Sequence, residues 1–211
     1  MAAAYTLYGS FLSAPTYKVA LMLTLCGQAY DYRHVDLAKG EHKTPDFLQL
    51  NRYGQVPVLR HGALTLCQSN TILEYLAEGP GSKFAGSGPT ERQRIREWMM
   101  WETDRLYPGI NRTRFFERFA KPDPAVTDFM RKVGEQALGV LDGLLDGKRF
   151  LVGERPTIAD LCVFGCLAHM AEARFDIGHW PAVKAWWERV TALPGFLLPY
   201  DLLPKADRDA A

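Results

Sequence analysis

A break in composition divides the chain and most limits what it can fold into. Residues 78–89 hold four glycines and two prolines in twelve residues, which is typical of a linker rather than a helix or strand. Short β-prone runs alternate with helical runs before this break, whereas long helical periodicities and no convincing strand follow it. The 211 residues are enough for two small domains. We therefore expect a mixed α/β domain at residues 1–80 and an all-helical domain at residues 89–211.

Hydrophobic periodicity and turn residues predict the elements of the first domain. Tyr5 to Tyr8 is β-prone, the run from Pro15 to Cys26 is helical, and β character returns at 30–35. Three further elements are predicted by capping and turn residues: a helix after Thr44, a hairpin around 61–62, and a helix at 71–77 that Ser69 caps. The expected order is βαβαββα.

The second half of the chain is predicted to contain only helices, at 90–119, 124–146, 157–171 and 181–192. Thr157 and Asp160 have the spacing of a capping box, which stabilises a helix start and has no catalytic part. Three side chains of the third helix recur at helical spacing, Cys162, Cys166 and His169. A buried helix face accounts for them, since a fourth metal ligand is not evident, and we assign no metal.

Charge and hydropathy exclude two classes of partner. Lys and Arg total 25 against 24 for Asp and Glu, so the chain has no excess positive charge with which to hold nucleic acid. The least polar stretch, 161–171, is far shorter than the roughly 20 residues that cross a bilayer. Four cysteines are few for this length and lie in apolar surroundings, and the start of the chain lacks signal-peptide character; both features favour a reduced, cytoplasmic protein.

Three local signals have both a structural and a chemical interpretation. Ser13 precedes a helix that opens with Pro15, so it is either a plain cap or a hydroxyl that stabilises an anion beside the positive helix end. The segment 55–57 is either an ordinary strand entry or a backbone edge for an extended peptide ligand, with a cis Val–Pro bond. The pair 68–69 is either a helix cap or a carboxylate site. Each signal is weak alone.

Taken together, the order and spacing of segments 8–13, 40–45, 54–57, 68–69, 156–160 and 180–186 closely resemble the cytosolic glutathione transferases. The resemblance implies a thioredoxin-like first domain and an all-helical second domain. Ser13 and the following Lys18–Val19 look like the serine-type phi, theta and delta classes, which implies that Ser13 activates glutathione. Tyr8 and Ser10 remain alternatives.

The resemblance also implies how glutathione is held. The glycine carboxylate falls to His42 and Lys43 with Gln55 nearby, and the cysteinyl unit to the Val56 backbone beside cis-Pro57. The γ-glutamyl end falls to two residues of this chain, Gln68 and Ser69. An acid of the neighbouring subunit in a homodimer completes the set; Glu102 is our choice and Asp104 the alternative. Three residues depart from the family pattern, Arg52, Asn70 and Gln68.

The activity that the resemblance implies is conjugation of the glutathione thiolate to small hydrophobic electrophiles, with no cofactor beyond glutathione. The second domain is expected to supply most of the electrophile pocket, whose members are Leu12, Tyr107, Asn111, Arg114 and Phe115. Because no cysteine occurs between Tyr8 and Val19, disulfide exchange is disfavoured. Two alternatives stay open: a glutathione-dependent peroxidase, and a non-catalytic ligand-binding or interaction protein with the same fold.

Overall fold

A computed structural model of the chain describes residues 4–210 and divides into two compact units. One unit contains the chain as far as Lys83 and takes it up again from Pro194, and the other is Phe84–Leu193. The first change of unit falls inside the glycine- and proline-rich segment 78–89. The second differs from the expected division, because the residues after Leu193 leave the helical unit and pack with the α/β unit.

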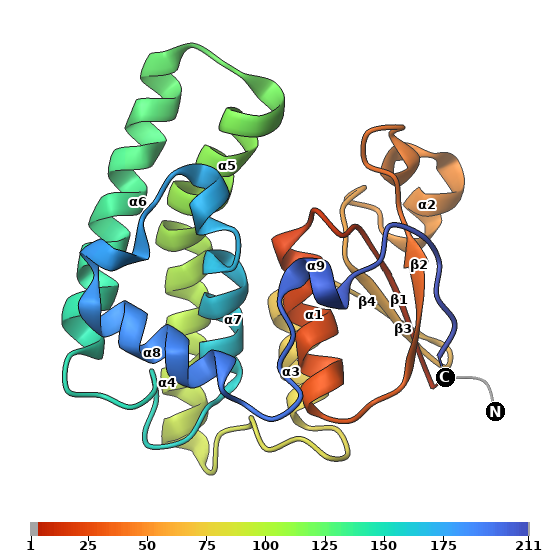
Figure 1. The fold of residues 1–211 in the computed structure, drawn as a ribbon. Helices are drawn as coiled ribbons and strands as arrows, with labels where there is room; N and C mark the ends of the chain where they lie inside the picture. Colours follow the sequence, from red (N-terminus) through yellow and green to blue (C-terminus); the bar gives the residue numbers. More distant parts are fainter. Residues whose placement is uncertain (1–3, 211) are drawn as a thin grey trace. The chain divides into compact units, whose positions relative to one another are not determined.

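The α/β unit is built on a four-stranded sheet in the order β2-β1-β3-β4 (Figure 1). Its strands are β1 (Tyr5–Gly9), β2 (Tyr30–His34), β3 (Val58–His61) and β4 (Leu64–Cys67). β2 runs parallel to β1, whereas β3 is antiparallel to both β1 and β4. This topology, with helices between the strands, confirms the thioredoxin-like fold.

The helices of this unit cover both faces of the sheet. Those in its first part, up to Lys83, are α1 (Ala14–Leu25), η1 (Glu41–Lys43), α2 (Pro45–Leu50) and α3 (Ser69–Ala77), and α1 packs against α3. A Cβ on Gly9 would come within 2.1 Å of Thr16 on α1, so the face of β1 that holds Gly9 lies against this helix. Tyr8 points to the opposite face, where it packs against a buried cluster formed by Val35, Val58 and Phe47 of α2.

The helical unit begins with one long helical stretch that is α4 (Pro89–Trp101) at its start. It continues through π-helical turns, η2 (Glu102–Leu106), η3 (Pro108–Arg112) and η4 (Phe116–Ala120), with a short α5 (Thr113–Phe115) between them. After it come α6 (Pro124–Leu145), α7 (Ile158–Leu167), η5 (Met170–Ala173), η6 (Ile177–His179) and α8 (Pro181–Thr191) (Figure 1). The all-helical character predicted for this part of the chain is confirmed.

Local signals located most helix starts correctly. The Thr157 hydroxyl and the Asp160 carboxylate form the predicted capping box of α7, and the Thr44 hydroxyl caps α2. One predicted cap is wrong: Ser69 is already the first residue of α3, and Gln68, at the cap position, makes no side-chain capping bond. None of the helices within residues 4–210 has the length and apolar character to cross a membrane.

Candidate active site

Three loops that lie far apart in the sequence meet at one end of the strands β1, β3 and β4. Tyr8 near the end of β1 pairs with Val58 at the start of β3, and Val58 pairs with Cys67 at the end of β4. Three segments therefore lie at the same end of the strands: the loop that follows β1, the cis Val56–Pro57 bond that precedes β3, and the Gln68–Ser69 pair that follows β4. The register thus brings together the three segments that the sequence analysis singled out.

Ser13 occupies the N-cap of α1. Its hydroxyl oxygen accepts a hydrogen bond from the Thr16 amide at 3.2 Å, its backbone is extended, and Pro15 lies in the first turn. Within residues 4–210 the Ser13 hydroxyl hydrogen has no acceptor of its own. Because the side chain is only half-buried, that hydrogen is available to a ligand at the positive end of the α1 dipole.

The two alternatives to Ser13 lie in different surroundings. Ser10 is 1% exposed, and its hydroxyl oxygen accepts a hydrogen bond from the Leu12 amide at 3.5 Å. Both residues lie in the turn that a hydrogen bond from the Ser13 amide to the Ser10 carbonyl oxygen closes. Tyr8 packs against the cluster around Phe47 on the α2 side of the sheet. Of the three hydroxyls, only that of Ser13 belongs to the N-terminus of α1.

His42 and Lys43 lie against the loop that leads to Val56. Lys43 Nζ donates to the Gly54 carbonyl oxygen at 2.8 Å. Gly54 has a φ of +57°, and a Cβ there would come within 3.0 Å of the His42 carbonyl oxygen. Burial and the neighbouring Lys43 charge both lower the pKa of His42. Its imidazole Nδ1 is buried and has no hydrogen-bond partner among the described residues.

Asn51 is a residue of this site that the sequence analysis missed. It is 1% exposed, its Nδ2 donates to the Gln55 carbonyl oxygen at 2.6 Å, and its Oδ1 accepts from the Tyr53 amide at 3.0 Å. It therefore fixes the turn that places the Gln55 side chain and the Val56 backbone at this end of the strands. The sequence signal for this role was an asparagine three residues before a glycine.

Gln68 adopts an unusual backbone conformation, with a φ of +70° and a ψ of 111°. Non-glycine residues in such regions are uncommon and gather at ligand sites. Asn70, the second residue of α3, accepts a hydrogen bond from the buried Lys18 of α1 at 3.3 Å. This bond ties together the two helices at whose N-terminal ends the site candidates Ser13 and Ser69 lie.

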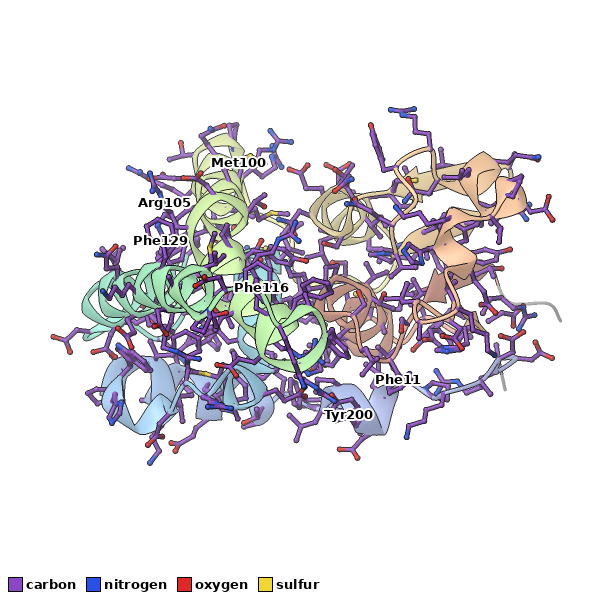
Figure 2. The ribbon with its side chains drawn as sticks, turned by 90° about the horizontal axis from the view of Figure 1, so that it is seen from above. Phe11, Met100, Arg105, Phe116, Phe129 and Tyr200 are labelled. Atoms are coloured by element: carbon purple, nitrogen blue, oxygen red, sulfur yellow. The ribbon has the colours of Figure 1, made fainter. Side chains whose placement is uncertain are left out.

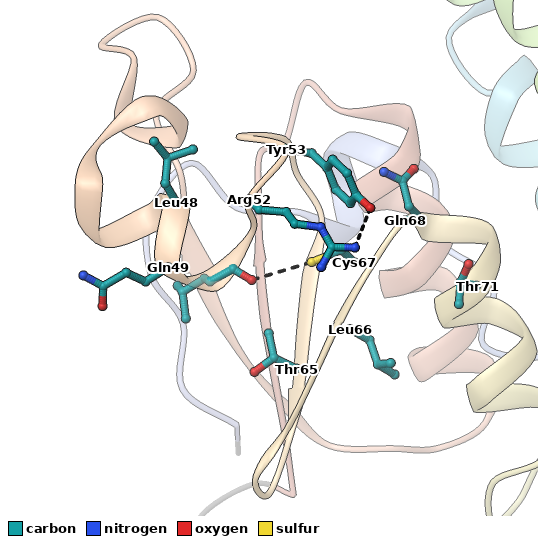
Figure 3. Close-up of a pocket in the computed structure, with 10 residues that line it drawn as sticks. Leu48, Gln49, Arg52, Tyr53, Thr65, Leu66, Cys67, Gln68 and Thr71 are labelled. Carbon is teal, nitrogen blue, oxygen red and sulfur yellow. Dashed lines mark hydrogen bonds between the residues drawn. The ribbon is translucent and has the colours of Figure 1, made fainter.

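A pocket of about 430 Å³ borders Gln68 on the side of α2 (Figure 3). In it Arg52 donates to the Tyr53 hydroxyl at 2.7 Å, and the Cys67 thiol approaches the Leu50 carbonyl oxygen at 3.6 Å. Burial raises the pKa of Cys67, so this thiol stays protonated at neutral pH and is not a nucleophile in place of the missing loop cysteine.

Glu102 is buried within its own unit. The side chain is turned into the helical unit, 1% exposed, and its Oε2 accepts from the Cys162 thiol at 3.3 Å. Its expected contact with the glutathione of a neighbouring subunit stays a prediction. Asp104, the alternative, is the exposed acid of the two and pairs with Arg105 at 2.8 Å.

The residues expected to form the electrophile pocket have different environments in their own units. Asn111 is 9% exposed and donates to the Cys166 carbonyl oxygen at 3.2 Å, and the Arg114 Nε donates to Glu172 at 2.9 Å. Both side chains are thus engaged inside the helical unit. Phe115 is 45% exposed, while Leu12 and Tyr107 are half-buried.

The described residues contain no group of three or more His, Cys, Asp or Glu side chains that could hold a metal ion. Cys162 is engaged with Glu102 and Cys166 with Asn111, whose Nδ2 lies 2.9 Å from the Cys166 sulfur. These contacts are those of a packed helix face.

Comparison with known proteins agrees with this geometry. Residues 3–78 match the N-terminal domain model of glutathione S-transferases, and residues 108–194 match the C-terminal domain model. Glutathione S-transferase 3 of Zea mays is 31% identical over an alignment of 206 residues, which covers 90% of this chain and 90% of its own. A maleylacetoacetate isomerase of Rhizobium meliloti is 31% identical over 93% of this chain and 95% of its own.

Among solved structures, a glutathione S-transferase of Pseudomonas fluorescens superposes with a TM-score of 0.88 at 33% identity, over 94% of this chain and all of the other. Both domain models and this fold-level match extend over the unit that holds the three converging loops and over the helical unit. The chain belongs to the glutathione S-transferase family, and it is a glutathione transferase.

Proposed function

We propose that this enzyme conjugates the thiolate of glutathione to small hydrophobic electrophiles, a detoxifying reaction, and that Ser13 is the residue that stabilises the thiolate. The observation that carries the proposal is the half-buried Ser13 hydroxyl, which caps α1 with its oxygen and keeps its hydrogen for a ligand. The hydroxyl donates to the thiolate while the positive end of α1 lies beside it.

The energy required is within reach of these two groups. A thiol with an ordinary pKa of about 8.5 is only a few per cent ionised at neutral pH. Lowering this pKa by two units takes about 2.7 kcal/mol of preferential thiolate stabilisation. A charge-assisted hydrogen bond contributes about 1.5–3 kcal/mol and a helix terminus about 0.3–1 kcal/mol, so no cofactor beyond glutathione is required.

The rest of glutathione is proposed to lie along the same end of the strands β1, β3 and β4. The Val56 backbone beside Pro57 pairs with the cysteinyl unit, in the way that an exposed strand end binds an extended peptide. Lys43 and the neutral His42 approach the glycine carboxylate with Gln55. Gln68 and the first amides of α3 at Ser69 take the γ-glutamyl carboxylate, since a helix N-terminus favours an anion.

The electrophile is proposed to contact Leu12 from the loop after β1, together with Tyr107 and Phe115 from the helical unit. Asn111 and Arg114 are assigned a supporting part, because their side chains are held by Cys166 and Glu172. They fix the helix that carries Tyr107 and Phe115 rather than touching the electrophile.

We also propose that the enzyme is a cytoplasmic homodimer. All four cysteines are free thiols, which suits a reducing compartment. Met100 of α4 is 64% exposed and Phe129 of α6 is 62% exposed, and both lie on the same side of the helical unit (Figure 2). Apolar side chains that gather on one face favour association with another chain. Sedimentation at micromolar concentration tests the dimer, and a monomer there would overturn it.

The function is tested with Ser13→Ala and Ser13→Thr. Ser13→Ala should bind glutathione within severalfold of the wild-type affinity, measured by calorimetry, because the two ends of glutathione keep their partners. Turnover with chlorodinitrobenzene should fall about 10- to 100-fold, the cost of one hydrogen bond to a charged group. Ser13→Thr, which keeps both hydroxyl and cap, should retain most of the activity.

The same assay separates the alternatives. Turnover of an organic hydroperoxide but of no electrophile would replace the proposal with a peroxidase, and turnover of maleylacetoacetate alone would replace it with an isomerase. Tight glutathione binding without turnover of any of these substrates would favour a non-catalytic binding protein. Full activity of Ser13→Ala, together with loss of activity in Tyr8→Phe or Ser10→Ala, would move the catalytic role to that residue.

A further inference from the structure

The C-terminal segment, defined here as residues 194–210, covers the edge of the sheet that β2 forms (Figure 1). The Tyr32 amide of β2 donates to the Arg208 carbonyl oxygen at 2.7 Å, and the Arg208 amide donates back to Tyr32 at 2.9 Å. The His34 amide donates to an Asp207 carboxylate oxygen at 2.8 Å. The segment thereby satisfies the outer backbone groups of an edge strand that otherwise face solvent.

Side chains fix the segment at two further places. The Arg208 guanidinium donates to the Tyr30 hydroxyl at 3.0 Å and to the Leu202 carbonyl oxygen at 3.3 Å, so it bridges β2 and α9 (Pro199–Leu202). The Tyr17 hydroxyl of α1 donates to the Leu197 carbonyl oxygen at 2.8 Å. Tyr17 is fully buried, so its hydrogen bond holds the start of α9 firmly against α1.

Between these anchors the segment contacts the loop 10–13. The ring of Phe11 in this loop lies 6.4 Å from the ring of Tyr200 on α9 and 5.7 Å from that of His34 on β2 (Figure 2). Lys205 Nζ lies 5.3 Å from the centre of the same ring. Phe11 is thus held on one side by a strand of the sheet and on the other by the C-terminal segment.

Phe11 belongs to the turn that sets the position of Ser13. In this turn the Ser13 amide donates to the Ser10 carbonyl oxygen at 3.0 Å, and Ser10 itself is 1% exposed. The turn is therefore fixed at Ser10 by burial and at Ser13 by the helix cap, and its middle is fixed through the Phe11 ring. A ring that loses the Tyr200 contact leaves the middle of the turn free to move.

We infer that the C-terminal segment is a positioning element of the catalytic loop, and that Tyr200, with Lys205, orders the turn 10–13 through Phe11. The inference rests on the proposed role of Ser13. Tyr200 and Lys205 are positioning residues, since they act on the Ser13 hydroxyl through Phe11. The segment thus acts on the thiolate step without itself contacting glutathione.

The test compares Tyr200→Ala with Leu198→Ala. Both side chains lie in the C-terminal segment and are similarly exposed, 50% and 45%, but only Tyr200 faces the Phe11 ring. Tyr200→Ala should lower kcat about three- to tenfold, the range that one aromatic pair represents, with little change in the KM for glutathione. Hydrogen exchange at the Leu12 and Ser13 amides should become faster. Leu198→Ala should change neither, and Tyr200→Phe should restore both.

Unchanged kcat and unchanged amide exchange in Tyr200→Ala would overturn the inference. A rise in the KM for glutathione of the same size as the fall in kcat would also contradict it, because it indicates a general loosening of the unit. Failure of the proposed function is seen separately: Ser13→Ala would then keep full turnover, whereas the exchange of the loop amides in Tyr200→Ala would still report whether the segment orders the turn.

Discussion

Asn51 Nδ2 donates at 2.6 Å to the carbonyl oxygen of Gln55, the residue directly before the cis Val56–Pro57 bond. This bond joins the end of α2 to the loop that presents the Val56 backbone. The side chain is almost completely buried, so water does not replace the bond once the donor is lost. We therefore expect this neutral amide to influence the affinity for glutathione through the position of the Val56 backbone.

We expect Asn51→Asp to raise the KM for glutathione about fivefold to fiftyfold, because a buried carboxylate oxygen facing the Gln55 carbonyl leaves two acceptors unpaired. The kcat should change much less, since Ser13 is untouched. Steady-state kinetics with varied glutathione measures both. Gln49→Glu makes the same chemical change on the exposed side of α2 and serves as the control; an equal effect of the two substitutions would contradict the role of Asn51.

The pH dependence of the rate provides a second test of Ser13. In the wild-type enzyme the thiolate should form well below the ordinary thiol pKa of about 8.5. In Ser13→Ala the rise of kcat/KM with pH should move to higher pH. The thiolate that remains after the thiol loses its proton is then no longer stabilised by the Ser13 hydroxyl, so the thiol ionises only at higher pH. An unchanged profile, with turnover lower by a constant factor, would show that Ser13 does not control ionisation.

Asp160 should matter for stability and not for catalysis. Its two oxygens accept from the Leu151 amide, the Trp186 indole, and the Thr157 amide and hydroxyl, all at 2.8–3.2 Å. Asp160→Asn removes one acceptor and should lower the free energy of unfolding by about 2–3 kcal/mol. Urea titration measures the loss, and Asp146→Asn at the exposed end of α6 is the control. Equal stability of the two variants would contradict this assignment.

His169 should make the protein less stable as the pH falls. Burial, together with the charges of Arg114 and Arg118, lowers its pKa to about 3, so at neutral pH a neutral imidazole contacts Glu172 at 3.1 Å. Between an unfolded-state pKa of about 6.5 and the folded value, the unfolded chain binds the extra proton. The free energy of unfolding should therefore fall by up to about 1.4 kcal/mol per pH unit in this window.

His169→Gln should remove this component, so its unfolding free energy should depend less on pH between about 6 and 3. The exposed His179 provides the matched substitution, His179→Gln, which should leave the pH dependence as it is in the wild type. Denaturant titrations at a series of pH values supply the comparison. Parallel curves for His169→Gln and the wild type would show that His169 is not the responsible group.

Elements governed by neighbouring residues could be predicted from the sequence. Ser13, Thr44 and Thr157 cap helices as expected, because a cap depends on amides only two or three residues away. The glycine- and proline-rich segment marked the first change of unit for the same reason, since breakers act locally. The family resemblance then supplied the site candidates Ser13, Gln55 and Gln68, whose roles stay predictions.

The tertiary structure decided what depends on contacts between distant residues. Periodicity does not tell which way Glu102 points, and packing against Cys162 turns it inward. The bond from Asn51 to Gln55 exists because the chain folds back at Gly54. The pairing of Tyr32 with Arg208 has no local signal, because it requires that β2 form the edge of a sheet and that the chain return to it 176 residues later. The sequence thus determined the order of the elements, and contacts between distant segments determined which residues lie together at the candidate site.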